Sequence, residues 1–149
     1  MFLNLKKNFT LLTILMFAVV FVGTSCKKDD EKTTEDYLVA HNWKWTSIKL
    51  GTTETIEICD QDDVITFHKN KEFHRDAGAQ KCEPTESQEV TGTWSVSTAT
   101  TPETLTINYT ENTVTYKFEY KLVSVTKDKI EMSIDVPGFG TLNAILEKK

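Results

Sequence analysis

Apolar and polar residues alternate with a period of two through most of residues 43–146, and turn residues interrupt the pattern every eight to twelve positions. Valine, isoleucine, threonine and aromatic residues dominate these stretches, which is typical of β-strands. No helical pattern of the usual length follows residue 42. The chain is therefore expected to fold as an all-β protein.

About eight strands are expected, covering residues 43–48, 64–68, 72–75, 90–96, 104–109, 114–125, 130–134 and 142–146. Sequential strands joined by short turns, with one solvated face, favour an antiparallel meander. Eight such strands close most economically as an up-and-down barrel, which removes exposed edges and leaves room for one small ligand. A two-sheet sandwich is the alternative.

A short helix is expected ahead of the first strand. Thr33 and Asp36 have the spacing of a helix-capping box, and residues 37–40 can continue the helix for one turn or two. Of the aromatic residues, Trp43 and Trp94 are expected to fill the closed end of the barrel. Others line a pocket if the barrel has a wide mouth, and the sequence does not say which.

Residues 69–71 predict a tight hairpin with Phe67 opposite Phe73. In this register His68 and His74 share the outer face without facing each other. Two exposed histidines are therefore expected there rather than a metal site.

Residues 1–25 have the organisation of a secretory signal peptide, with Lys6 and Lys7 followed by the apolar residues 9–22 and then small residues. The apolar stretch is shorter than the roughly 18–20 residues that a membrane-spanning helix needs. A cleaved leader is therefore expected, with a retained transmembrane anchor as the alternative.

The segment Gly23-Thr24-Ser25-Cys26 resembles the lipobox of bacterial lipoproteins, although Gly23 stands where an aliphatic residue is usual. The resemblance implies cleavage before Cys26 and attachment of acyl chains such as palmitate to its thiol. Each buried lipid CH₂ contributes about 0.8 kcal/mol, so several chains hold a protein to a membrane almost permanently. Secretion with a free Cys26 is the alternative.

Residues 26–33 are expected to form a charged tether, because a run of lysines and acidic residues cannot pack into a core. The run also resembles the signal that sends lipoproteins of the bacteroidete type to the cell surface. The expected location is the cell envelope, on the outer membrane. Surface display and a periplasm-facing position both stay open.

Removal of residues 1–25, which carry two lysines and no acidic residue, changes the net charge from −5 to −7. An acidic domain without a basic patch is not expected to bind nucleic acid. Of three cysteines, Cys59 and Cys82 are left as an even pair in an oxidising compartment. A disulfide is expected between them, and a two-thiolate metal site has no supporting CxxC or Cys/His cluster.

Ordered landmarks after residue 33 allow a family to be named. A short helix, Trp43, the run from Cys59 to Phe67, Cys82 and the segment Gly92-Thr93-Trp94 resemble the lipocalin-like domain of bacteroidete lipoproteins. The resemblance covers most of residues 34–149 and implies a calycin-like barrel. The Gly-x-Trp of true lipocalins is not intact, because His41 stands at the glycine position.

Candidate chemistry in the chain is sparse. Asp60, Asp62 and Asp63 lack the glycine and distal glutamate of a calcium loop, so a solvated turn is expected. No motif for nucleophilic catalysis is present, and no enzyme, cofactor or metal is expected. The favoured function is a lipid-anchored, non-catalytic binding module for a small apolar or amphipathic ligand. The alternative is a structural or protein-interaction lipoprotein of the envelope with a filled barrel.

Overall fold

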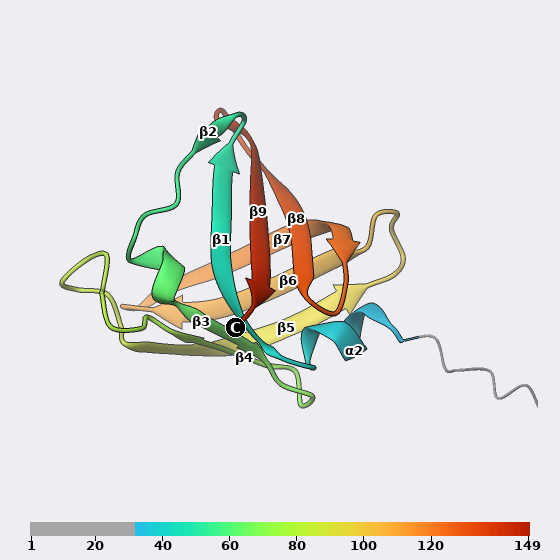
Figure 1. Cartoon of the computed structure of the whole chain (residues 1–149), viewed down its shortest axis with the longest axis horizontal. Helices are drawn as coiled ribbons and strands as arrows, with labels where there is room; N and C mark the ends of the chain where they lie inside the picture. The colour runs from blue at the N-terminus through green and yellow to red at the C-terminus, as the bar shows by residue number, and fades with distance from the viewer. Residues whose placement is uncertain (1–31) are drawn as a thin grey trace, which may run out of the picture. The chain divides into compact units, whose positions relative to one another are not determined.

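Nine β-strands and one short α-helix make up residues 32–149, the part of the chain that the computed structural model describes (Figure 1). The expected leader, Cys26 and most of the tether lie outside the described residues. The elements are α2 (Thr34–Leu38), β1 (Asn42–Leu50), β2 (Thr53–Glu54), the 3₁₀ turn η1 (Asp60–Asp62), β3 (Val64–Phe67), β4 (Glu72–Asp76), β5 (Glu89–Ser97), β6 (Thr104–Glu111), β7 (Val114–Val125), β8 (Lys129–Val136) and β9 (Gly140–Lys148).

The sheet closes on itself. From β3 to β9 each strand pairs antiparallel with the next along the chain, and β1 pairs with both β3 and β9. The two-residue strand β2 only extends β1. The eight remaining strands form a closed antiparallel barrel, which confirms the expected fold and rules out the open sandwich.

Two β-bulges keep the apolar residues of long strands inside the barrel. In β1 the register shifts between Trp45 and Ser47, and in β7 it shifts between Leu122 and Ser124. An extra residue moves every following side chain to the other face. Leu122, just before the bulge, is buried opposite Met132, and Val123, the extra residue of β7, is 63% exposed. Val125, after the bulge, is thereby brought back to the inner face and packs against the core.

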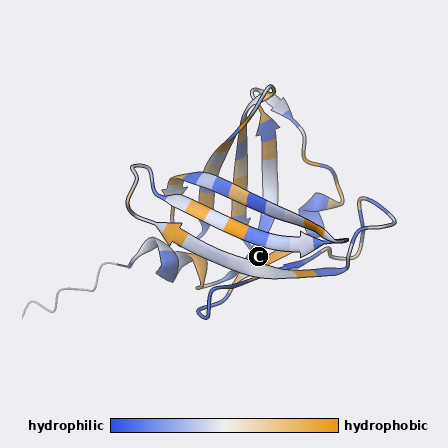
Figure 2. Cartoon of the chain, turned by 180° about the vertical axis from the view of Figure 1, so that it is seen from behind, coloured by the Kyte–Doolittle hydropathy of each residue, from blue (hydrophilic) through white to orange (hydrophobic). Residues whose placement is uncertain are grey.

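The hydrophobic core fills the barrel interior. Figure 2 shows the alternation of hydrophobic and hydrophilic residues along the strands that produces it. The core side chains below 3% exposure include Leu38, Trp43, Ile65, Phe67, Trp94, Leu105, Ile130, Met132, Ala144 and Leu146. The strands of residues 32–149 close into a barrel around this core, so this segment contains the contacts that the barrel needs to fold by itself.

Helix α2 begins with the expected capping box. The backbone N–H of Asp36 donates to the Thr33 hydroxyl, and the backbone N–H of Thr33 donates to the Asp36 carboxylate. The helix ends by burying Leu38 in the core, and the Leu38 carbonyl accepts a 2.8 Å hydrogen bond from the indole N–H of Trp43. The helix is thereby fixed to the start of β1.

The hairpin between β3 and β4 lies at this same end. The indole N–H of Trp94 donates to the His68 carbonyl, and the Lys71 ammonium lies 4.2 Å from the centre of the Trp94 ring. Lys71 also pairs with Glu35 of α2. We call this the helix end of the barrel. Its filling by Trp43 and Trp94 is what the sequence predicts.

None of the helices within residues 32–149 combines the length and the apolar character that crossing a membrane requires.

Candidate functional site

A cavity of about 110 Å³ lies inside the barrel, between the core at the helix end and the opposite end, which we call the mouth. Its aliphatic lining is Ile65, Ile107 and Leu146, and Arg75 is the only charged side chain of the lining. The rest of the lining is aromatic: Trp45, Phe67, Phe73, Tyr109, Phe118 and Tyr120. This mostly apolar wall with one charged hydrogen-bond donor has the general character of a small-molecule site.

The aromatic rings of the lining are stacked in a continuous row across three strands. The ring centres of Phe73 and Tyr109 are 5.9 Å apart at an interplanar angle of 21°, and those of Tyr109 and Phe118 are 6.0 Å apart at 28°. Phe118 and Tyr120 continue the row at 5.9 Å and 22°. Such stacked arrangements are favourable between rings, so the row forms one continuous aromatic part of the cavity wall.

Gly92 of β5 makes this row possible. It pairs with Phe73 on one side and with Tyr109 on the other. A Cβ atom at Gly92 would lie 2.0 Å from the carbonyl oxygen of Asn108 and 2.7 Å from the Tyr109 Cβ atom. Only glycine lets β6 come this close, and Tyr109 then stacks on Phe73 across the gap.

Arg75 is held by two carboxylates at the mouth. Its Nη2 atom lies 3.2 Å from an oxygen of Glu111 and 3.2 Å from an oxygen of Glu86. These three side chains are only 13–18% exposed. Glu111 comes from the end of β6 and Glu86 from the β4–β5 loop, so the ion pairs also fix that loop over the mouth.

The other donors of Arg75 have no protein partner in the described part of the chain. All its hydrogen bonds and ion pairs within residues 32–149 use Nη2. Its Nε atom is buried there without a hydrogen-bond acceptor. A buried donor without an acceptor is costly, so this arginine has unused hydrogen-bonding capacity beside the cavity.

Asp63 lies next to this cluster and is only 4% exposed. Burial raises the pKa of its carboxyl to about 7, with Glu86, Asp60 and Asp62 adding to the rise and Arg75 opposing it. Burial also raises the pKa of the phenols of Tyr109 and Tyr120. The phenols of the lining therefore stay neutral at ordinary pH.

The burial of Asp63 corrects an expectation from the sequence. The acidic run after Cys59 was expected to be a solvated turn, and that expectation is wrong for Asp63. Asp62 is also engaged, since one of its carboxylate oxygens accepts hydrogen bonds from the backbone N–H groups of Ala79 and Gln80 at 2.7 and 3.2 Å. The run therefore anchors the β4–β5 loop instead of lying free in solvent.

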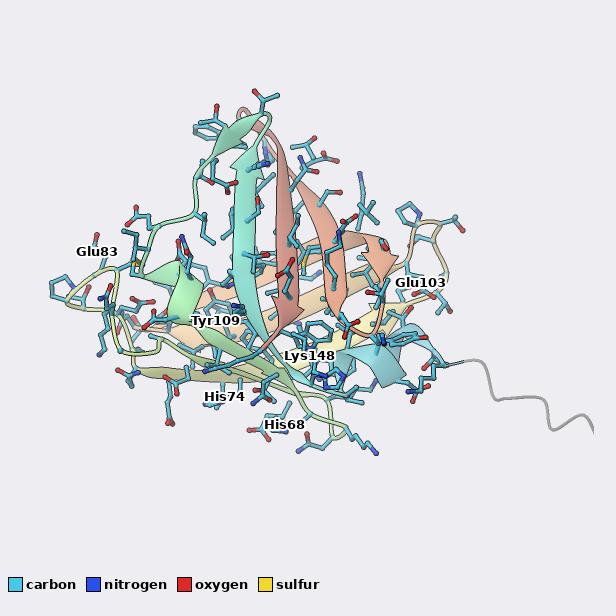
Figure 3. The ribbon with its side chains drawn as sticks, in the orientation of Figure 1. His68, His74, Glu83, Glu103, Tyr109 and Lys148 are labelled. Atoms are coloured by element: carbon cyan, nitrogen blue, oxygen red, sulfur yellow. A yellow bond between two sulfur atoms is a disulfide. The ribbon has the colours of Figure 1, made fainter. Side chains whose placement is uncertain are left out.

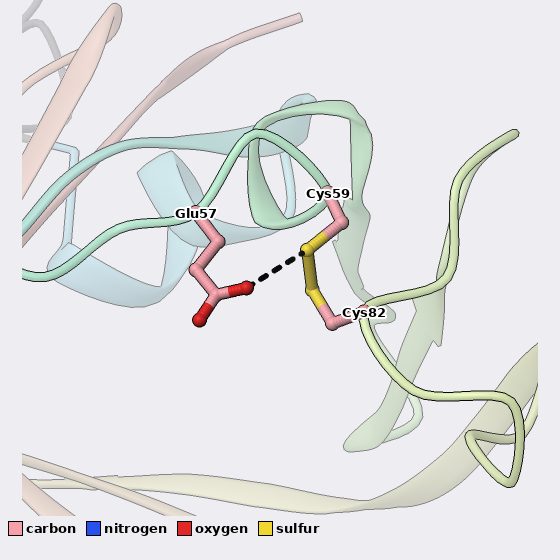
Figure 4. Close-up of side chains that lie close together, drawn as sticks. All are labelled: Glu57, Cys59 and Cys82. Atoms are coloured by element: carbon pink, nitrogen blue, oxygen red, sulfur yellow. Dashed lines mark hydrogen bonds between the residues drawn. A yellow bond between two sulfur atoms is a disulfide. The ribbon is translucent and has the colours of Figure 1, made fainter.

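The disulfide between Cys59 and Cys82 is present, as expected, with 5.2 Å between the two Cα atoms. It joins the segment before η1 to the β4–β5 loop, beside the mouth. The Glu57 carboxylate lies 3.7 Å from the Cys59 sulfur, and Figure 4 shows the three side chains together. These three are the only close group of potential metal ligands among residues 32–149. Both sulfurs are bonded to each other and carry no thiolate, so they do not fit a metal.

The expected hairpin register is confirmed. Phe67 pairs with Phe73 and Thr66 pairs with His74. His68 and His74 lie on the outer side of the hairpin in Figure 3, away from the cavity, and His74 approaches the Glu89 carboxylate at 4.0 Å. The structure does not bring the two histidines into the site.

Sequence reasoning did not single out Arg75, Glu86 or Glu111. The sequence does contain a signal for Arg75 and Glu111. Arg75 follows Phe73 by two positions and Glu111 follows Tyr109 by two, so strict alternation already placed both on the inner face. Glu86 has no such signal, because it lies in a loop whose path depends on the disulfide and on Asp62.

Fold and site together define a closed antiparallel β-barrel with a small interior cavity. The family model described as a lipocalin-like domain matches residues 39–132. The chain belongs to this family, whose members are generally binding proteins. A search of the curated proteins finds no match.

Proposed function

We propose that this protein is a lipid-anchored, non-catalytic binding module of the cell envelope, whose barrel holds a small apolar or amphipathic molecule. The observation that carries the proposal is the cavity of about 110 Å³ with its aromatic wall. The barrel interior is otherwise filled by side chains at the helix end. The cavity offers a molecule a place to bind inside the barrel, next to Arg75.

The nature of the wall supports binding rather than catalysis. The lining contains one charged group, Arg75, and no pair of groups suited to nucleophilic or acid–base chemistry. Membership of a family of binding proteins agrees with this assignment.

Native mass spectrometry of residues 32–149, purified without denaturant or detergent, tests the ligand. A small molecule that co-purifies and is released on unfolding is the expected result. The variant Phe118→Trp serves as a comparison that should not bind, because the larger ring fills part of the cavity and should exclude the molecule. A wild-type barrel with no bound mass and no uptake of an apolar dye would contradict the proposal.

The proposed anchor rests on the sequence of residues 1–33, with lipid on Cys26. The substitution Cys26→Ala is expected to release the protein from the membrane fraction of the producing cell. Lys27→Ala, one residue away, leaves the thiol intact and should stay in that fraction. A Cys26→Ala protein that still sediments with membranes would refute the anchor.

We assign the anchored protein to the outer membrane and favour surface display, on the basis of the charged run 27–32. Protease added to intact cells should then degrade the protein. Replacement of Asp29, Asp30 and Glu31 by alanine should protect it. Survival of the unaltered protein during this treatment would place the barrel on the periplasmic side.

A second candidate function is docking of an envelope protein to the outside of the barrel. It is favoured by large apolar side chains on the surface, since Ile58 is 78% and Phe139 is 75% exposed. If the barrel proves empty, Ile58→Ser and Phe139→Ser are the variants that test this candidate by loss of a cross-linked partner.

A further inference from the structure

The cavity has chemical features that restrict what it can hold, and these deepen the proposed function on which they rest. Its wall is mostly aromatic, with the stacked row from Phe73 through Tyr109 and Phe118 to Tyr120. Aromatic side chains make favourable stacked or edge-to-face contacts with another ring, so this wall suits a flat, aromatic molecule. The volume of about 110 Å³ is of the same order as the ~150 Å³ apolar cavity that is known to hold benzene.

Arg75 supplies the one charged contact that such a molecule finds in the cavity. Its Nη2 atom is committed to Glu86 and Glu111, whereas its Nη1 atom makes no hydrogen bond or ion pair within residues 32–149. The guanidinium has donors on every nitrogen and accepts nothing. A bound molecule with an oxygen acceptor would therefore satisfy a donor that the protein leaves unsatisfied.

The charge around Arg75 determines which acceptor is favoured. Glu86 and Glu111 already outnumber the single positive charge, and Asp63 lies close to them. A second anion placed against the same guanidinium would be repelled by these carboxylates. A cation in the cavity would be repelled by Arg75 itself. The phenols of Tyr109 and Tyr120 are neutral, so they compensate neither the charge of a bound anion nor that of a bound cation.

We infer that the ligand is a small, flat, uncharged molecule with a carbonyl or similar oxygen that accepts a hydrogen bond from the free side of Arg75. The aromatic row holds its body, and Glu86 and Glu111 hold the arginine in place. Selectivity for a neutral acceptor thus comes from the part of Arg75 that its carboxylate partners do not occupy.

Three probes of nearly equal shape separate the contributions. Acetophenone carries a neutral carbonyl, benzoate carries a negative charge, and α-methylstyrene has no acceptor. Each is titrated into residues 32–149 and followed by NMR. Acetophenone should bind about tenfold more tightly than either of the other two, as expected for one hydrogen bond from a charged donor.

The variant Arg75→Lys keeps a positive charge beside Glu86 and Glu111 but lacks the extra donors. It should bind α-methylstyrene as the wild type does and lose the preference for acetophenone. Lys121→Met is the matched control, because Lys121 pairs with Asp135 on the outside of the barrel and should leave the preference unchanged. The preference within the wild type needs no variant, so misfolding of Arg75→Lys does not affect that part of the test.

The outcomes distinguish the inference from the function on which it rests. If acetophenone and α-methylstyrene bind equally well, or benzoate binds most tightly, the inference about the ligand is overturned while the cavity remains a binding site. If none of the three probes binds and native mass spectrometry also finds no bound mass, the proposed function itself fails.

Discussion

At the scale of single residues, Gly92 shows most directly how one side chain position controls the site. The substitution Gly92→Ala adds one methyl group. Its Cβ atom would lie against the backbone of Asn108 at a distance that real Cβ atoms do not adopt. Strands β5 and β6 must then move apart, at an expected cost of about 2–3 kcal/mol in the free energy of unfolding. Urea denaturation measures this, and Ser95→Ala at an exposed position of β5 is the control. An unchanged midpoint for Gly92→Ala would contradict the packing described.

Asp63 makes the stability of the protein depend on pH. Burial raises its pKa from 3.8 to about 7 in the folded state, so the folded protein holds a proton that the unfolded chain releases at lower pH. The stability from this group is complete below about pH 4 and is lost as the pH rises through about 7. The loss should amount to about 2–4 kcal/mol.

The variant Asp63→Asn tests this dependence, because its amide resembles the protonated carboxyl. It should match the wild type near pH 4 and be the more stable protein at pH 8, as measured by urea denaturation across the range. Asp128→Asn at the surface is the control and should keep the wild-type slope. If the free energy of unfolding fell more steeply with pH in Asp63→Asn than in the wild type, the predicted direction of the pH dependence would be wrong.

At the scale of elements, local pattern predicts the strands well but not their irregularities. Strand β7 has the bounds expected from alternation, Val114–Val125, because Tyr116, Phe118 and Tyr120 mark one face unambiguously. The bulge after Leu122 was not predicted, because it depends on how β7 pairs with β8. The burial of Asp63 was not predicted for a similar reason, because its surroundings include Arg75 and Glu86, which are distant in the sequence.

Helix α2 is an element whose stability depends on one hydroxyl group. Thr33→Ala removes the acceptor for the backbone N–H of Asp36, which should cost about 1 kcal/mol in the free energy of unfolding. Thr33→Ser keeps the hydroxyl and is the matched control. Because Leu38 and Glu35 connect the helix to Trp43 and Lys71, the loss should appear in the global unfolding transition. A loss confined to local fraying, with the global transition unchanged, would mean that the helix is independent of the barrel.

At the scale of the whole molecule, the two ends of the barrel differ in how they are built. The helix end is packed with Trp43 and Trp94, and the sequence predicted that filling from the aromatic residues alone. The mouth is arranged by contacts between residues far apart in the chain, such as Arg75 with Glu111. The alternation along the strands places both side chains on the inner face but does not predict that they meet. The disulfide is the one connection at the mouth that cysteine counting could predict.

This division predicts what reduction of the Cys59–Cys82 disulfide does. The bond closes a loop between residues 23 positions apart, so its loss should lower the free energy of unfolding by about 3 kcal/mol. Since the bond joins only loops at the mouth, amide hydrogen exchange should accelerate in residues 77–88 and change little in β5 near Trp94. The double variant Cys59→Ala/Cys82→Ala should behave like the reduced wild type. Equal acceleration at both ends would show that the disulfide holds the whole barrel rather than its mouth.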